Sequence, residues 1–262
     1  MKVTLGTAIS LTSMFGLLVV GRGQVGAAQP PPYAGPSPTV VSGAGDITAV
    51  VEQYRNLLGP NNGGDPGSRG TGRREINWDG VSDDFSAPNF LPPDFFNNEA
   101  APRARGAFST PGSGVQVSAD SDNPFGAAPR FGHINPSYSD RFTTFSPERL
   151  FSPIDSNIVD MTFFVPGTTT PAVVSGFGAV YTSVDQDHTA FEYFDRNGSS
   201  LGRFAVPISV DGLSFLGVAF GSPVVARVRI EYGTAALGPD DDQYTDVAVM
   251  DDFVYAEPVA TN

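Results

Sequence analysis

The sequence predicts an all-β protein, an antiparallel β-sandwich of jelly-roll type with one N-terminal helix. Seven segments rich in Val, Phe, Tyr and Ile follow one another between residues 158 and 255, and Gly, Pro, Asn or Asp separates them. No helical pattern comes between these segments, which argues against a parallel βαβ arrangement. The chain also has 30 glycines and 23 prolines among its 262 residues, which are too many for a long helical bundle.

The charge and the cysteine content narrow the classes of function. The chain has 15 Lys and Arg against 28 Asp and Glu, a net charge of −13 at pH 7, so it should repel the phosphate backbone of a nucleic acid. The absence of cysteine removes disulfides, thiolate metal sites and cysteine nucleophiles. Two histidines leave few ways to build a zinc site or a Ser-His-Asp triad. We therefore expect no nucleic-acid partner and none of these catalytic centres.

The first 28 residues are typical of an export signal. Lys2 gives a positive start, the stretch from Leu5 to Val20 is mainly apolar, and small residues lead up to Ala28, after which we expect cleavage. A transmembrane anchor is the alternative, but this apolar stretch is short for a membrane span and several polar residues interrupt it. The sequence thus predicts a secreted or extracytoplasmic protein with no membrane span in the mature chain.

The region that follows the signal divides into a leader and a helix. Residues 29–45 contain five prolines and predict a flexible, Pro-rich leader without fixed structure. Residues 46–58 predict a helix that Asp46 caps and that Gly59 and Pro60 end. Its apolar positions recur at the three-and-four spacing of a helix face: Ile47, Val50, Val51, Tyr54, Leu57 and Leu58. This helix opens a single sandwich domain over residues 46–258, and residues 259–262 form a tail.

The predicted strands lie mostly in the second half of the chain. Residues 82–153 show no strong periodicity, apart from a short strand expected at residues 115–118. The seven clear segments are 158–165, 173–181, 189–195, 201–206, 214–220, 224–232 and 246–255. Asn197-Gly198 is a hairpin signal between two of them. Within 224–232 the apolar residues alternate with more polar ones, which predicts one buried face and one solvated face.

Two adjacent acids interrupt the last predicted strand, in Val249-Met250-Asp251-Asp252-Phe253. A regular strand would point one aspartate toward each packed layer, and a buried carboxylate needs a partner. The partner is either a structural ion pair with Arg73 and Arg74 or a bound Ca²⁺, which oxygen ligands hold without His or Cys. The candidate metal ligands are Asp79, Asp185, Asp187 and Asp252. A third interpretation makes these acids ordinary surface residues, with a bulge turning one of the pair to water.

Trp78, the single tryptophan, is the candidate ligand-binding residue. It would either stack on a sugar ring or, as its apolar neighbours Ile76 and Val81 favour, anchor the core. The sequence identifies no catalytic residue: a glycosidase needs two carboxylates, and 28 acids offer too many pairs to select one. His133 and His188 are better explained as structural or exposed side chains than as bases.

Several separated motifs resemble a group of uncharacterised bacterial exported β-sandwich proteins. They include GRREINWDGV at 72–81, FVPGTTTPAVVSGFGAVYTSVD at 164–185, LSFLGVAF at 213–220 and DVAVMDDFVYAEP at 246–258. The group is similar in style to exported proteins that end in a Pro-Glu-Pro sorting tail, but here Glu257-Pro258 is followed by four residues only, so we do not expect such a tail. The resemblance implies secretion and one continuous domain, and it implies no ligand or reaction.

These observations together favour a secreted, non-catalytic binding protein, whose partner would be an extracellular carbohydrate or another cell-surface component, with a possible structural calcium ion. This step is an analogy from fold and location. The alternatives are a carbohydrate-active enzyme that uses two carboxylates and a structural envelope or matrix protein. A concave groove that holds two acids roughly 5 to 10 Å apart, with aromatic residues nearby, would favour the enzyme. A flat face with exposed aromatics and no acid pair would favour the binding protein.

Overall fold

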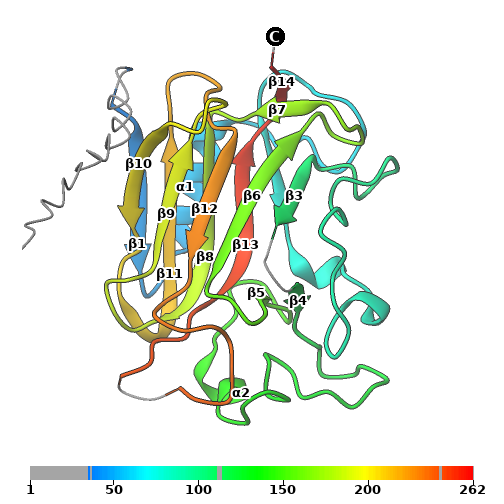
Figure 1. The fold of residues 1–262 in the computed structure, drawn as a ribbon, viewed down its shortest axis with the longest axis vertical. Coiled ribbons are helices and arrows are strands. Elements are labelled where there is room, and N and C mark those ends of the chain that lie inside the picture. The colour runs from blue at the N-terminus through cyan, green and yellow to red at the C-terminus, as the bar shows by residue number, and fades with distance from the viewer. Residues whose placement is uncertain (1–34, 36, 111–113, 242–243, 262) are drawn as a thin grey trace, which may run out of the picture. The chain divides into compact units, whose positions relative to one another are not determined.

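The computed structural model describes residue 35 and residues 37–110, 114–241 and 244–261. In this part of the chain two antiparallel β-sheets pack face to face (Figure 1), which confirms the predicted all-β sandwich. The predicted signal peptide, most of the predicted leader and the last residue of the tail lie outside the described residues. No helix in the described ranges is both long enough and apolar enough to cross a membrane.

The first sheet, which we call the covered sheet, has a helix on its outer face; the second is called the open sheet. In hydrogen-bonded order the covered sheet consists of β1 (Thr39–Ala44), β11 (Ser209–Ala219), β8 (Gly176–Val184), β13 (Val249–Ala256), β5 (Phe151–Pro153) and β4 (Val115–Val117), with β2 (Arg73–Ile76) also paired to β13. The open sheet consists of β10 (Ser200–Ala205), β9 (Ala190–Phe194), β12 (Arg227–Glu231), β6 (Ile158–Phe164), β7 (Pro171–Val173) and β14 (Val259–Ala260), with β3 (Ala107–Thr110) also paired to β6.

The connections between the sheets give the jelly-roll topology. Eight of the strands, taken along the chain, are β5, β6, β8, β9, β10, β11, β12 and β13. They are arranged as β5-β13-β8-β11 in the covered sheet and β6-β12-β9-β10 in the open sheet. The chain therefore crosses between sheets at every step except the hairpin from β9 to β10, which is the strand order of two interlocked Greek keys. Each of the seven predicted segments overlaps one of these strands.

The interior between the sheets is largely aromatic. Alternate residues of β6 are buried, among them Val159, Met161 and Phe163, while the residues between them face outward. Phe177 of β8 lies at the centre of this core and contacts the rings of Phe253 and Tyr255 with centroid distances of 5.3 and 6.4 Å. Hydrophobic burial between the two sheets is thus the main stabilising contribution to the fold.

Helix α1 (Thr48–Leu58) covers the outer face of the covered sheet, as the sequence predicted for residues 46–58. Tyr54 of this helix is fully buried, and its hydroxyl donates a hydrogen bond of 2.9 Å to the carbonyl of Val218. The Tyr54 ring can lie this close to the sheet because Gly217 has no side chain: a Cβ there would lie 2.6 Å from the ring. The glycines of β8 and β11 therefore set the distance between helix and sheet.

Three local predictions were wrong or incomplete. Within the predicted flexible leader, residues 39–44 form β1, which pairs along its full length with β11. Within the predicted tail, β14 pairs with β7. The short helix α2 (Tyr138–Arg141) and the 3-10 turns η1 (Trp78–Gly80) and η2 (Asp83–Phe85) had no sequence signal that we recognised. In β1 and β14 a neighbouring strand supplies the hydrogen bonds, and a local pattern does not reveal a neighbour from a distant part of the sequence.

Candidate functional site

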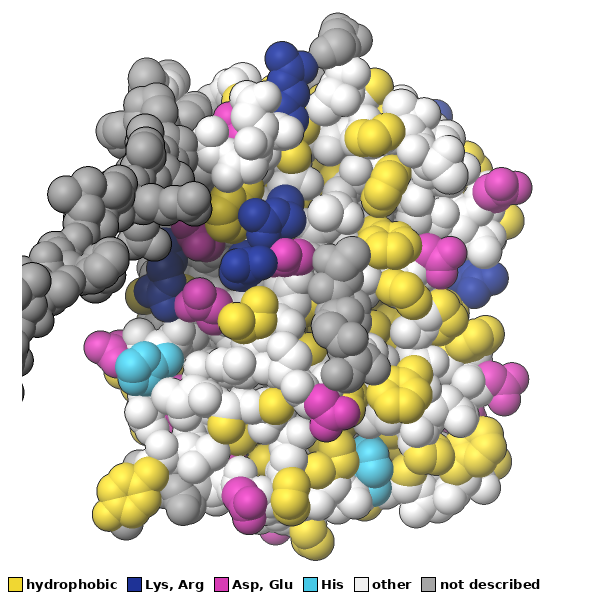
Figure 2. Space-filling model, in the orientation of Figure 1, with side chains coloured by type: hydrophobic (Ala, Val, Ile, Leu, Met, Phe, Trp, Pro, Cys, Tyr) yellow, Lys and Arg dark blue, Asp and Glu magenta, His cyan; other side chains and the backbone are white. Residues whose placement is uncertain are grey.

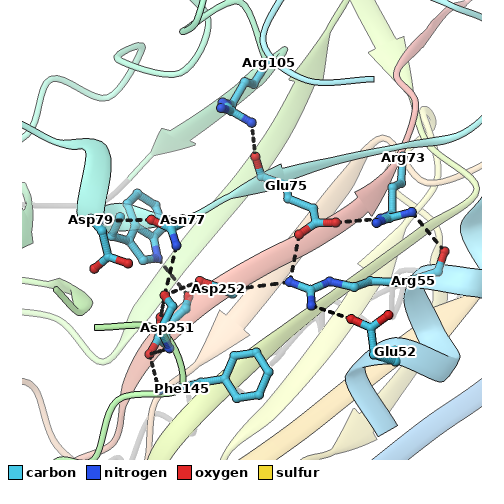
Figure 3. Close-up of polar contacts among 12 residues, drawn as sticks. Glu52, Arg55, Arg73, Glu75, Asn77, Asp79, Arg105, Phe145, Asp251 and Asp252 are labelled. Atoms are coloured by element: carbon cyan, nitrogen blue, oxygen red, sulfur yellow. Dashed lines mark hydrogen bonds and ion pairs between the residues drawn. The ribbon is translucent and has the colours of Figure 1, made fainter. Parts of the chain in front are cut away.

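The two adjacent acids of β13 lie on a β-bulge. Met250 pairs with Tyr181 of β8 and Phe253 pairs with Ala179, so Asp251 and Asp252 together face a single residue of that strand. Both carboxyls reach the same hydroxyl: the Oγ of Ser146 lies 3.1 Å from Asp251 Oδ1 and 2.8 Å from Asp252 Oδ1 (Figure 3). The prediction that a regular strand points them to opposite layers is therefore wrong.

Both acids are buried, as the sequence predicted, with 0% exposure for Asp251 and 4% for Asp252. Asp251 Oδ2 accepts hydrogen bonds from the backbone N–H groups of Phe145, at 2.6 Å, and Ser146, at 3.2 Å. Burial and the neighbouring Asp252 carboxyl raise the pKa of Asp251 well above its usual value. Burial also raises the pKa of Asp252, while the hydrogen bond from Ser146 and the charge of Arg55 oppose that rise. The geometry suits a pair that retains one proton, because Ser146 has only one hydroxyl proton for two carboxyl contacts.

A ladder of alternating charges connects this pair to helix α1 and strand β2 (Figure 3). The Nη2 of Arg55 lies 3.5 Å from Asp252 Oδ2 and 2.8 Å from Glu75 Oε2, and Nη1 of the same guanidinium lies 2.8 Å from Glu52. Glu75 in turn binds Arg73 Nε at 2.6 Å. Three elements that are distant in sequence are thus held together by one network of charge-assisted hydrogen bonds.

The predicted ion pairs of Arg73 and Arg74 with the two acids of the bulge do not form. In strand β2, Arg74 pairs with Tyr255, which follows the bulge in β13. The Arg74 side chain therefore contacts Glu257 and not the two aspartates. The Arg74 guanidinium is fully buried and binds Glu257 through two bonds, from Nε at 2.8 Å and from Nη2 at 2.9 Å. It also donates to four backbone carbonyls, those of Gly63, Asp65, Gly67 and Ala104. Arg74 therefore fixes the glycine-rich loop before β2, and Arg55 is the cation beside Asp252.

The four predicted metal ligands lie in separate surroundings. Asp79 accepts a hydrogen bond from the backbone of Arg149 at 2.9 Å, and Asp185 pairs with Arg141 at 2.9 Å. Asp187 is 86% exposed, and Asp252 belongs to the buried pair. Across the described ranges no three His, Asp or Glu side chains gather in a way that could hold a metal ion. These four acids therefore do not form one calcium site.

Trp78 is a core residue and not an exposed sugar platform. Its side chain is 2% exposed, and its ring stacks on Phe151 with a centroid distance of 4.3 Å and an interplanar angle of 12°. Its Nε1 donates a hydrogen bond of 2.8 Å to the carbonyl of Asp251, so it also supports the bulge. The interpretation as a buried anchor is correct, and the ligand-binding interpretation of this residue is wrong.

We expect the buried pair to make the protein less stable as the pH rises from about 4 toward neutral. The folded state holds protons on these carboxyls more tightly than the unfolded chain does. The stabilisation is therefore complete below the ordinary pKa of 3.8 and is lost as the pH passes through the raised values. Asp251→Asn replaces the bound proton with an amide donor. The variant should have the same melting temperature as the parent near pH 4 and a higher one near pH 7. For a chain of this length, each 1 kcal/mol of added unfolding free energy raises the melting temperature by about 2–4 °C.

Asp46 provides a control whose contribution to stability should depend on pH in the opposite direction, because hydrogen bonds from Thr48 lower its pKa. Asp46 contributes to the free energy of unfolding above its ordinary pKa, and this contribution is lost as the pH falls. Any loss of stability in Asp46→Asn should therefore become smaller in acid. Equal destabilisation by Asp251→Asn at pH 4 and pH 7 would show that the pair does not hold an extra proton.

The solvent-accessible candidate site is a groove of about 680 Å³ at the edge of the open sheet where β3 pairs with β6. We call it the β3–β6 groove. It is lined by Asp94, Asn97, Asn98, Glu99, Phe108, Phe164, Gly167, Thr168 and Thr169. The rings of Phe108 and Phe164 are half-buried and meet edge to face, with centroids 6.0 Å apart. The groove thus combines aromatic surface with amide, hydroxyl and carboxyl groups.

Hydrogen bonds between its two loops hold the groove in shape. Asn97 donates from Nδ2 to the carbonyl of Thr168 at 2.9 Å and accepts from the N–H of Gly167 at 3.3 Å. The side-chain oxygen Oδ1 of Asn98 accepts a hydrogen bond of 3.1 Å from the N–H of Ala100. Rigid strands on one side and crosslinked loops on the other give a largely preformed site.

Elsewhere the open face carries a group of basic and acidic side chains that lie close together, a ladder of ion pairs (Figure 2). Asp160 of β6 binds Arg229 of β12 through two bonds of 2.9 and 3.0 Å, and Arg227 packs over the ring of Phe194 at 3.8 Å. Hydrophobic side chains gather in Figure 2 on the side away from this ladder. The positive and negative charges of this ladder neutralise one another, whereas the groove has acidic side chains and no basic one.

Sequence reasoning missed this groove. Its residues come from the stretch 82–153 and from the turn after β6, where no periodicity marks a site. The available signal was the sequence Asp94 to Glu99, in which two phenylalanines and two asparagines stand between acids. Of these rings, however, Phe95 and Phe96 turn into the core, and the groove takes its aromatics from β3 and β6.

The comparisons with known proteins give no assignment for this architecture. No family model matches the chain, and no curated protein matches it significantly. The geometry of the β3–β6 groove and of the buried network is therefore the basis for the functional argument.

Proposed function

We propose that this protein is a secreted, non-catalytic binding protein for an extracellular carbohydrate and that the β3–β6 groove holds the sugar. The observation that carries the proposal is the pairing of two half-buried phenylalanine rings with amide and carboxyl groups in one preformed groove. A sugar ring has an apolar face of C–H groups and a rim of hydroxyls, which these two kinds of lining complement. The volume of about 680 Å³ also lies within the range of small-molecule sites.

The export pattern of residues 1–28 supports an extracellular ligand, because a protein outside the cytoplasm encounters surface and matrix glycans. The groove also leaves polar groups for recognition. Asp94 and Glu99 are exposed, and the Asn98 amide faces the same groove. Acceptors and donors fixed beside an aromatic surface give orientation to a ligand that the rings alone would bind without specificity.

Phe164→Ala should weaken carbohydrate binding at least tenfold, which corresponds to about 1.4 kcal/mol. The ring is one of the two aromatic rings that line the groove, and its removal takes away a large part of the apolar contact surface. A glycan array with the mature protein would first identify the ligand, and calorimetry would then compare the variant with the parent.

Phe125→Ala is the matched control, because Phe125 is 48% exposed and does not line the groove. It should bind like the parent, and circular dichroism should show that both variants fold. A protein that binds no glycan on the array would contradict the proposal and would favour the structural envelope or matrix alternative. Equal affinity for Phe164→Ala and the parent would place the binding site elsewhere.

The two-carboxylate enzyme is the second candidate, because the β3–β6 groove holds two acids beside aromatic rings. Both acids are exposed, however, whereas the general acid of a glycosidase lies where its surroundings raise its pKa. Asp251 and Asp252 share one serine hydroxyl and are buried under the backbone of residues 145–146, whereas a glycosidase places its two acids on either side of a bound sugar. Asp94 and Glu99 do line the groove and are the acids that an enzyme would use. Incubation of the identified oligosaccharide with the protein, followed by chromatography, distinguishes the two, since a binding protein returns the ligand uncut.

A further inference from the structure

We propose that the carbohydrate held in the β3–β6 groove is cationic, an amino sugar that carries a free ammonium group. The inference rests on the proposed function, because it specifies the ligand of the same groove. Among the lining residues Asp94 and Glu99 are the charged ones, and none is Lys, Arg or His. The groove therefore has two acidic side chains and no basic one, on a chain whose net charge is −13.

The two groove carboxylates differ from the acids of the neighbouring face. There Asp160 binds Arg227 and Arg229, and Glu231 binds Arg203. No ion pair among the described residues involves Asp94 or Glu99. Arg103, on the same loop, stacks on the ring of Phe95 at 4.7 Å and does not line the groove. An anionic sugar would meet uncompensated repulsion here, while a cation would find two free acceptors.

The aromatic lining, like the two acidic side chains, favours a cationic ligand. An ammonium group over the face of a phenylalanine ring is attracted by the ring quadrupole. In the groove Phe108 and Phe164 present half-buried rings beside the carboxylates. A neutral sugar gains only hydrogen bonds to its hydroxyls from the carboxylates, but a free ammonium group also gains charge attraction to them. The combination of rings and unpaired acids thus selects the amino sugar from carbohydrates of equal size.

The test compares three oligosaccharides of equal length at about pH 6: a β-1,4-linked glucosamine oligomer, its fully N-acetylated form and a uronic acid oligomer. At this pH ordinary carboxylates are ionised. The parent should bind the free-amine oligomer at least tenfold more tightly than the acetylated one and should not bind the uronic acid oligomer. Raising the salt concentration from 0.05 to 0.5 M should reduce the preference, because exposed charges are screened.

The double variant Asp94→Asn, Glu99→Gln should lose the preference for the free amine, because Asn and Gln keep oxygen acceptors for sugar hydroxyls but carry no charge. Asp187→Asn is the control for loss of an acidic charge outside the groove, since Asp187 is 86% exposed and does not line the groove; it should keep the preference. Phe164→Ala should weaken binding of both the free-amine and the acetylated oligomers.

The outcomes separate this inference from the proposed function. Equal or tighter binding of the acetylated or uronic acid oligomer would overturn the cationic ligand and leave carbohydrate binding intact. Binding of none of the three, together with a silent glycan array, would overturn both. If oligolysine binds as well as the glucosamine oligomer and Phe164→Ala does not weaken it, the groove attracts positive charge alone, and the amino sugar is wrong.

Discussion

Replacement of Arg74 by methionine is expected to lower the free energy of unfolding by about 3–5 kcal/mol. The variant would leave the Glu257 carboxylate buried without its cation, and Glu257 is 3% exposed. The four backbone carbonyls that Arg74 binds would also lose a donor, which frees the loop before β2. Urea or guanidinium unfolding, followed by circular dichroism, would measure the loss.

Two further variants keep the Arg74 prediction interpretable. Arg69→Met removes an arginine of the same loop whose ion pair with Asp65 is long, at 3.6 Å, and largely exposed, so it should cost about 1 kcal/mol or less. Arg74→Lys retains the charge but loses the two-bond geometry with Glu257, and it should give an intermediate loss if the methionine variant does not fold. A loss for Arg74→Met no larger than that for Arg69→Met would contradict the role of the buried pair.

Replacement of Trp78 by alanine is expected to cost about 3–5 kcal/mol, because it opens a large cavity in the core. The ring stacks on Phe151 and meets Phe96 and Phe253 edge on, at centroid distances of 5.6 and 4.9 Å. Its removal also leaves the carbonyl of Asp251 without the indole donor. Chemical denaturation would measure the cost by circular dichroism, since the variant has no tryptophan fluorescence.

Trp78→Phe is the companion variant, which retains most of the apolar volume and should be destabilised less. Glycan affinity provides the second readout. The folded Trp78→Ala protein should bind carbohydrate like the parent, because Trp78 does not line the β3–β6 groove. A stable Trp78→Ala variant that no longer binds would show that this residue contacts the sugar after all.

Strands were predictable where apolar and polar residues alternate, because one face of the segment is then buried and the other is exposed to solvent. Residues 158–165 and 224–232 show this alternation and hold β6 and β12. The central strands β8 and β13 are buried along their whole length, and continuous apolar runs between turn residues predicted them. The leading helix was predictable because its buried residues Val51 and Tyr54 recur at helical spacing. Strand β1 was not, because of its six residues only Val41 is buried and its pairing with β11 supplies the stabilising bonds.

The candidate site was predictable only in part. The burial of Asp251 and Asp252 followed from the apolar residues around them, and burial implied that partners must exist. The bulge, the shared serine and the identity of the cation did not follow. Arg55 lies 197 residues from Asp252 in sequence, and Arg74 lies 183 residues from Glu257. The groove likewise depends on the turn after β6 folding against the loop before β3.

The sequence by itself determined the sandwich, the leading helix, the acidic charge and the need of two carboxyls for neutralising partners, because these depend on the order of apolar and polar residues along short segments. The tertiary structure decided which arginine meets which acid, where the strand bulges and where an aromatic groove opens to solvent. These features depend on register and loop packing between distant segments, so they arise only when the two sheets close on each other.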